Sequence, residues 1–184
     1  MNAPENISRY SPEYDMPVRG DTITADRYIT REWMALENRH LWPKVWHLGG
    51  MLAELEEEGD FIRHNFGKES VIMVRQADGT IKAFYNTCPH RGNRLILGDA
   101  GGAPRITCGY HGWTWDLAGA LKRVPNRKGF GHLDNDDYAL IPAQVDTFGR
   151  IVFVNLDMDA MPLGEWLEGI PDDLSWCPLD DYRC

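Results

Sequence analysis

The sequence lacks any long apolar run and any excess of positive charge. No stretch of its 184 residues approaches the roughly 18–20 apolar residues that a membrane-spanning helix needs. Asp and Glu outnumber Lys and Arg by 28 to 19, which gives a formal net charge of −9. We therefore expect neither a membrane nor nucleic acid as a partner, whereas a protein with a basic patch suits the overall charge.

Signatures of secretion and of nucleotide chemistry are also missing. Residues 1–6 have no basic start and no apolar stretch, so a cytoplasmic location is the expectation. There is no internal repeat, no Walker loop, no dinucleotide-binding glycine fingerprint and no serine-triad motif. Nucleotide-binding and serine-hydrolase functions are thereby disfavoured.

Cysteine is scarce, with four in the whole chain. In a reducing compartment, Cys spaced closely with His more often marks a metal site than a disulfide. Cys177 and Cys184 have no nearby histidine and are interpreted as incidental thiols. Cys88 and Cys108 each have a histidine two or three residues later, so the functional interpretation is based on these two cysteines.

The patterning predicts one domain with appendages, because 184 residues are enough for a sizeable apolar core. Residues 1–45 are expected to form an extended, proline-bearing arm followed by a helix over 31–41, with Thr30 as its N-cap. Residues 46–157 are expected to form the domain itself. In 158–184 the pattern fades and proline recurs.

Short strands dominate the central region. The continuous apolar run within 70–75 predicts a strand buried on both faces, and Asp78-Gly79 predicts a hairpin turn after it. The glycine-rich stretch 92–104 is predicted to be loop. Other strands are expected over 46–48, 61–66, 80–85, 105–107, 113–115, 120–124, 140–146 and 150–156. The pattern predicts a mainly β fold, a sandwich or open barrel with an N-terminal helical extension.

Two Cys/His clusters form the candidate functional site. They read Cys-Pro-His-Arg-Gly over 88–92 and Cys-Gly-Tyr-His-Gly-Trp over 108–113, and each follows a predicted short strand. Gly92 and Gly112 would let the backbone turn tightly beside a metal. Thiolate and neutral imidazole together suit zinc or an iron–sulfur centre.

Ligand identity alone leaves zinc open, because Cys88, His90, Cys108 and His111 could hold one Zn²⁺ in a binding module. Zinc fingers, however, usually pair two Cys in one short motif and two His in another. Here each loop carries one Cys and one His. Mixed loops favour a two-iron cluster in which two cysteines hold one iron and two histidines the other.

The clusters resemble the Rieske signature, in the form found in α subunits of Rieske non-haem iron oxygenases, the aromatic ring-hydroxylating group. The resemblance covers roughly residues 28–157. It implies a Rieske-type antiparallel β-sandwich or open barrel that carries a [2Fe-2S] cluster. Further family landmarks are matched at 32–46, 59–61, 84–86, 116–119 and 149–156.

The resemblance also implies a role for each ligand. Cys88 and Cys108 would bind one iron as thiolates. His90 and His111 would bind the other iron through a ring nitrogen, leaving their outer nitrogens near the surface.

Three further residues are expected around the cluster. Arg91 is either a cation beside it or a surface arginine, and Tyr110 either covers it or packs in the core. Trp113, like Trp115, stands where the respiratory type of Rieske protein has a hydroxyl donor to sulfur. Because fewer donors disfavour the reduced cluster, a midpoint in the lower part of the roughly −150 to +300 mV Rieske range is expected.

The family implies partners as well. Its α subunits take electrons from a ferredoxin or reductase and pass them to a mononuclear Fe(II) in a second domain, commonly across a boundary in a homotrimer. Past His111 this sequence has one histidine, His132, so we expect that iron site to be absent and residues 158–184 to begin a linker toward it. The chain is expected to be an oxidoreductase component that does not hydroxylate alone. A free-standing Rieske electron carrier and a zinc-stabilised binding module are the alternatives.

Overall fold

The computed structural model describes residues 24–179 and 181 of the chain. The predicted arm up to about residue 20, and Cys184, lie outside the described residues. The chain divides into two compact units, 1–34 and 35–184, each considered by itself. No helix in the described part is long and apolar enough to cross a membrane.

Two helices open the described chain, α1 (Asp26–Ile29) and α2 (Arg31–His40). The predicted helix over 31–41 is confirmed to within one residue. Thr30 lies between the two helices, and its hydroxyl accepts the Trp33 N–H at 3.4 Å, as expected of a cap. The sequence pattern missed α1 because four residues carry no detectable periodicity.

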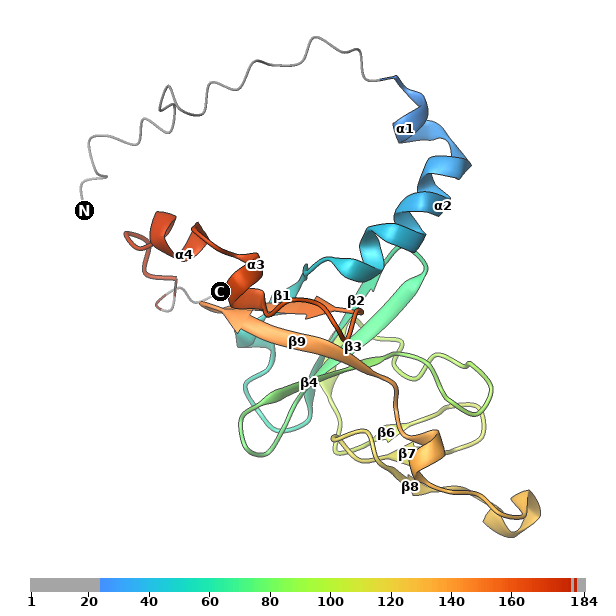
Figure 1. Ribbon diagram of the computed structural model, residues 1–184. Coiled ribbons are helices and arrows are strands. Elements are labelled where there is room, and N and C mark those ends of the chain that lie inside the picture. The colour runs from blue at the N-terminus through green and yellow to red at the C-terminus, as the bar shows by residue number, and fades with distance from the viewer. Residues whose placement is uncertain (1–23, 180, 182–184) are drawn as a thin grey trace, which may run out of the picture. The chain divides into compact units, whose positions relative to one another are not determined.

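Within the described residues, ten strands form two antiparallel sheets (Figure 1). The large sheet has the order β1-β10-β9-β4-β3-β2-β5, and the small sheet has the order β6-β7-β8. The strands are β1 (His47–Met51), β2 (Asp60–Phe66), β3 (Glu69–Arg75), β4 (Ile81–Tyr85), β5 (Ala100–Gly102), β6 (Ile106–Thr107), β7 (Thr114–Trp115), β8 (Leu121–Arg123), β9 (Pro142–Phe148) and β10 (Ile151–Asn155). The helical turns are η2 (Trp42–Lys44), η3 (Leu52–Glu54), η4 (Arg127–Phe130), η5 (Asp136–Tyr138), α3 (Leu163–Trp166) and α4 (Ile170–Asp173). The predicted mainly β fold is confirmed.

The large sheet curls into a half-barrel. Its β1 and β2 lie far apart in the strand order, yet His47 on β1 stacks on Phe66 of β2 with ring centroids 4.1 Å apart. A flat sheet could not bring these rings together, because neighbouring strands are about 4.8 Å apart. The expected open barrel is therefore the correct architecture.

Strand β3 is the wall shared by two apolar cores. Val71 and Met73 point into the core inside the curled sheet, whereas Ile72 and Val74 point into the core beneath the small sheet. All four side chains are buried, which confirms the prediction of a strand covered on both faces. The second core also contains the two cysteines of the predicted site.

The turn after β3 forms as its sequence predicts. Gly79 has φ +82°, a conformation that glycine adopts at no steric cost. The Asp78 carboxylate accepts hydrogen bonds from the Thr80 N–H at 2.9 Å and from its hydroxyl at 2.6 Å. This pairing closes the hairpin between β3 and β4.

One strand lies where loop was predicted. Ala100–Gly102 forms β5 and pairs with β2, with Gly102 opposite Asp60. Glycine has low strand propensity, but a Cβ at Gly101 would lie 3.1 Å from the Phe61 ring, so glycine permits this close approach. Tertiary pairing with an available edge therefore overrides local propensity here.

The turn at Gly119 yields a stability prediction. Gly119 has φ +87°, and a Cβ there would lie 2.6 Å from Cε1 of Phe84. We expect Gly119→Ala to lower the free energy of unfolding by about 2–4 kcal/mol, because backbone strain and overpacking add. Gly169 is the matched control, since it has φ +81° in the left-handed region with nothing within 4 Å, and Gly169→Ala should cost about 1 kcal/mol. Urea unfolding midpoints measure both, and equal losses would contradict the clash.

Candidate metal centre

The two predicted ligand loops have the same backbone design. The N–H of Cys88 donates at 2.8 Å to the carbonyl five residues later, and the N–H of Gly92 donates back to the Cys88 carbonyl at 2.8 Å. Cys108 and Gly112 make the same pair of bonds at 2.8 and 2.9 Å. Both glycines have φ +70°, which lets each loop turn back on itself.

Asn86 anchors the first loop to the sheet, and its side chain is 1% exposed. Its amide nitrogen donates to the Ser70 hydroxyl at 3.2 Å and to the Ile96 carbonyl at 2.7 Å. Its carbonyl oxygen accepts the N–H groups of Leu95 and Ile96 at 3.1 and 2.8 Å. The Asn86 amide nitrogen and carbonyl oxygen both have hydrogen-bond partners, and breaking any of these bonds would leave a buried polar group without a partner. The side chain therefore holds the loop rigidly.

The two cysteine sulfurs are buried free thiols. Cys88 and Cys108 are each 2% exposed, at the ends of the segments that follow β4 and β6. Burial raises the pKa of the Cys88 thiol. Burial acts on Cys108 in the same direction, but the backbone N–H groups of Tyr110 and His111, together with the Cys88 and Asn93 side chains, lower the pKa of Cys108 overall. Donors that stabilise a thiolate are what a metal-bound sulfur requires.

The two histidine rings lie next to each other. The centroids of His90 and His111 lie 4.9 Å apart, and His90 stacks on Trp113 at 4.6 Å with a 2° tilt. Burial, then the nearby His111 and Arg91, lower the pKa of His90, which favours its neutral form. Its Nδ1 is buried without a hydrogen-bond partner. A buried nitrogen lone pair without a donor is costly unless a metal takes it, so this atom fits a ligand.

The ligands are arranged in pairs and do not surround one point. Among the described residues, no group of three or more Cys, His, Asp or Glu side chains is placed to hold one metal ion. A structural zinc site needs four ligands around one ion, whereas a Rieske cluster takes two protein ligands per iron.

The three predicted neighbours lie around these rings. Tyr110 is 60% exposed and stacks on His111 with centroids 3.7 Å apart, so it covers that ring and does not pack in the core. Trp113 is buried against His90, and Arg91 is exposed next to it.

Two residues of the site were not predicted from the sequence. Asn93 has its side-chain nitrogen 3.7 Å from the Cys108 sulfur, within hydrogen-bond range for sulfur. The equal length of the two loops was the available signal, because it places Asn93 where the second loop has Trp113. Phe130, in η4, meets His90 edge-on, with the two ring centroids 5.8 Å apart. The segment around Phe130 is irregular, so its sequence carries no periodic signal.

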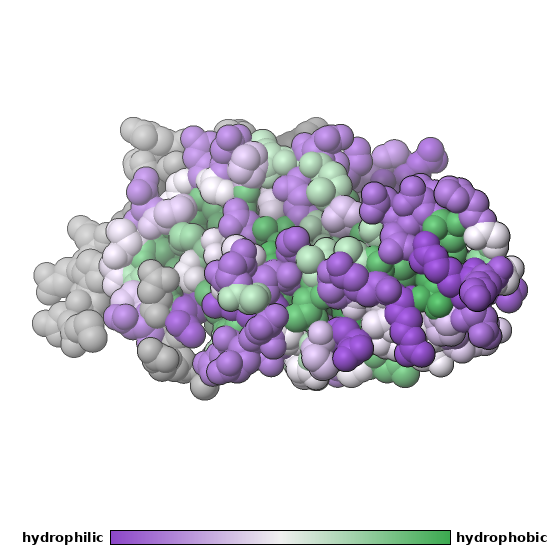
Figure 2. Space-filling model, turned by 90° about the horizontal axis from the view of Figure 1, so that it is seen from below, coloured by the Kyte–Doolittle hydropathy of each residue, from purple (hydrophilic) through white to green (hydrophobic). Residues whose placement is uncertain are grey.

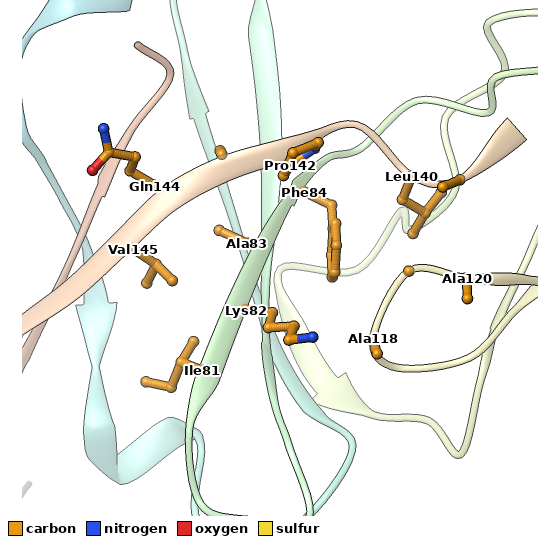
Figure 3. Close-up of a pocket in the computed structure, with 13 residues that line it drawn as sticks. Ile81, Lys82, Ala83, Phe84, Ala118, Ala120, Leu140, Pro142, Gln144 and Val145 are labelled. Atoms are coloured by element: carbon orange, nitrogen blue, oxygen red, sulfur yellow. The ribbon is translucent and has the colours of Figure 1, made fainter. Parts of the chain in front are cut away.

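A hollow of about 640 Å³ lies away from this site, between β4, β9 and the turn over 118–120 (Figure 3). Its lining is mainly apolar, including Ala83, Phe84 and Leu140. None of the predicted site residues lines it. The candidate metal centre and this hollow therefore share no lining residue.

Comparison with known proteins agrees with this geometry. Residues 45–148, more than half of the chain, match the family described as Rieske [2Fe-2S] domain. The chain is 36% identical over 141 residues to the chlorobenzene dioxygenase subunit alpha of Cupriavidus sp. (strain PS12), covering 76% of this chain and 31% of that protein. It is 30% identical over 171 residues to the carnitine monooxygenase oxygenase subunit of Escherichia coli (strain K12), covering 89% of this chain and 46% of that one.

The fold is shared as well. The apo structure of the quaternary ammonium Rieske monooxygenase CntA superposes with a TM-score of 0.80 at 29% identity, covering 87% of this chain and 47% of that chain. The chain thus spans less than half the length of these relatives and resembles their N-terminal part. With the paired ligand loops and the matched segment together, this chain belongs to the Rieske [2Fe-2S] domain family, which implies a [2Fe-2S] cluster.

Proposed function

We propose that this chain is the electron-transfer domain of an oxygenase α subunit of the ring-hydroxylating type. The observation that carries the proposal is the meeting of two buried thiols and two imidazoles on paired loops, with one imidazole nitrogen buried and unpartnered. The relatives in which this domain occurs are oxygenase subunits, so electron delivery to an oxygenase is the role that fits best.

Four residues would hold the cluster. Cys88 and Cys108 would bind one iron as thiolates, and His90 and His111 would bind the other as neutral imidazoles. When bound, the cluster takes up and releases one electron at a time. The burial of both sulfurs supports this assignment, because exclusion of water protects thiolate ligands from oxidation and exchange.

The neighbours have distinct proposed roles. Trp113 stacks flat on His90 and would fix the orientation of that ring. Tyr110 lies over His111 and would limit access of water to it. Arg91 would add positive charge beside the reduced, more negative cluster. Both histidine residues are partly exposed, so their rings offer the shortest path for an electron to leave the protein.

The proposal extends to domains and partners. Residues 1–45 would be an N-terminal arm and helix, 46–157 the iron–sulfur domain, and 158–184 the start of a linker. The match over 45–148 supports the central boundary. A ferredoxin or reductase would supply electrons, and a mononuclear iron in a catalytic domain would accept them, within a homotrimer.

Removal of any ligand should abolish the cluster. We expect the purified chain to be red-brown with about two irons and two acid-labile sulfides, as a [2Fe-2S] centre requires. His90→Ala and Cys108→Ser should lose most of that iron and the visible absorption. His132→Ala and Cys177→Ser remove the same residue types elsewhere and should retain both. A colourless protein that contains one zinc would refute the proposal.

Loss of the amide donor to sulfur should lower the midpoint potential. A hydrogen bond contributes about 0.5–1.5 kcal/mol, so Asn93→Leu should shift the one-electron midpoint down by about 20–60 mV. Thr107→Val is the control, because it removes a hydroxyl beside Cys108 that bonds to Thr114 and not to sulfur. Redox titration followed by electron paramagnetic resonance measures both variants. An unchanged midpoint in Asn93→Leu would show that the amide does not tune the cluster, and a parent midpoint above about +100 mV would contradict the low-potential expectation.

A further inference from the structure

Strands β4 and β9 pair briefly and then separate. Their ladder ends where Ala83 lies opposite Ala143. The same register, continued for two residues, would place Ile81 opposite Val145, but these two are not paired with each other and both line the hollow of about 640 Å³. Figure 3 shows both side chains in the gap between the two strands. The hollow therefore lies where the large sheet opens.

The lining of this hollow is apolar and leaves space for a guest. Six of the thirteen lining residues are alanine or glycine, so few side-chain atoms project into the hollow. The larger apolar walls come from Phe84 and Leu140 on one side and from Val145 on the other (Figure 3). Pockets of roughly 300–1,000 Å³ with mainly apolar walls and a few polar groups are typical of sites for small organic molecules. Both the size and the composition of the hollow fit that class.

One charged side chain lies in this apolar lining. Lys82 is the only charged residue among the thirteen, and it extends from β4 toward the turn over 118–120 (Figure 3). Within residues 24–179 and 181, no carboxylate is within ion-pair distance of its ammonium group. The amide nitrogen of Gln144, the only other polar side chain of the lining, already donates to the carbonyls of Asp157 and Ala160 at 2.8 and 3.4 Å. Lys82 is therefore the group available to the polar end of a ligand.

We propose that this hollow binds a small amphipathic carboxylate, with the hydrocarbon body against Phe84, Leu140 and Val145 and the carboxylate on the Lys82 ammonium group. Burial of the body is favourable because apolar surface is removed from water. One ammonium group matches one carboxylate, and the pair is screened less beside apolar surface than in open water. The inference goes beyond electron transfer and does not depend on the proposed function.

Metal ions and phosphate-bearing molecules fit the lining less well. Metal ions bind through Cys, His, Asp or Glu side chains, and none of these residue types lines the hollow. Phosphate groups are typically held by several cations or by the backbone N–H groups of a glycine-rich loop. The hollow offers one cation and one glycine, Gly119. A singly charged organic anion is the better match.

A partner chain, including a second copy of this one, is the competing occupant. A stable interface uses about 20–30 residues on each side, whereas thirteen residues bound this hollow. On the face seen in Figure 2, hydrophilic residues lie among the apolar areas, so that face offers no broad apolar surface to a partner. The limited extent of the hollow therefore favours a small molecule.

The test titrates the full chain, as purified, with sodium octanoate and with 1-octanol in a calorimeter. The two probes share a hydrocarbon chain and differ in charge, and we expect one octanoate site per chain. Lys82→Met keeps a flexible apolar side chain but removes the charge, so it should lower the octanoate-to-octanol affinity ratio by about fivefold or more. An unchanged ratio, or a parent chain that does not bind octanoate, would overturn the proposal.

Lys68→Met is the matched control, because it removes the same charge from the turn between β2 and β3, outside the hollow. Its affinity ratio should stay within about twofold of the parent, since at 0.1 M salt the effect of an exposed charge is screened over about 10 Å. An equal fall of the ratio in both lysine variants would assign the effect to net charge and would contradict a contact with Lys82.

Filling the hollow tests where the probes bind. Ala118 and Ala120 are exposed members of its lining, so Ala118→Trp and Ala120→Leu add volume there without replacing a buried residue. Each should weaken the binding of both probes by about tenfold or more, while its urea unfolding midpoint stays close to that of the parent. Octanoate binding that survives in both folded variants would place the site elsewhere and refute the assignment.

Sedimentation velocity separates the two kinds of occupant. A dimer that Ala118→Trp dissociates, together with absent octanoate binding, would assign the hollow to a second copy and overturn the proposal. An unchanged sedimentation coefficient in the variants that lose octanoate binding would support it. None of these measurements requires an iron–sulfur cluster, so their failure and the failure of the proposed electron-transfer function are distinguishable.

Discussion

Two buried cysteine sulfurs, one beyond the end of β4 and one at the end of β6, are the constraint on which the rest of the structure depends. A buried thiol is tolerable by itself, but a pair of thiolates is not, because each charge would be desolvated beside the other. The fold responds with backbone N–H groups aimed at the sulfurs and with β3 as a rigid wall behind them. Metal binding and folding are therefore coupled in this half of the molecule.

The same constraint explains the residues around the loops. Positive φ at Gly92 and Gly112 lets each loop close onto its own cysteine carbonyl. Asn86 then ties the first loop to β3 through its bond to Ser70 and to the following segment through its bond to Ile96. Trp113 stacks on the His90 ring, and the Nδ1 of that ring is buried without a hydrogen-bond partner. Each of these residues restricts the conformation of the next, so the two loops are pre-organised by the protein itself.

Prediction from sequence succeeded where chemistry is local and failed where pairing is distant. The Cys/His spacing, the run at 70–75 and the Asp78-Gly79 turn each carry their signal within a few residues, and the structure has those elements. Strand β5 forms only because β2 presents an edge to it, and glycine-rich Ala100–Gly102 carries no such signal. Phe130 reaches His90 across some forty residues of chain, a contact that no periodicity encodes.

Charge is the property for which the whole chain is the poorest guide. A net charge of −9 describes the molecule at distances much longer than the Debye length, whereas docking is decided within about 10 Å of the surface. Two acidic residues near the ligand loops are already paired with cations, so they do not neutralise the exposed Arg91, Arg94 and Lys128 there.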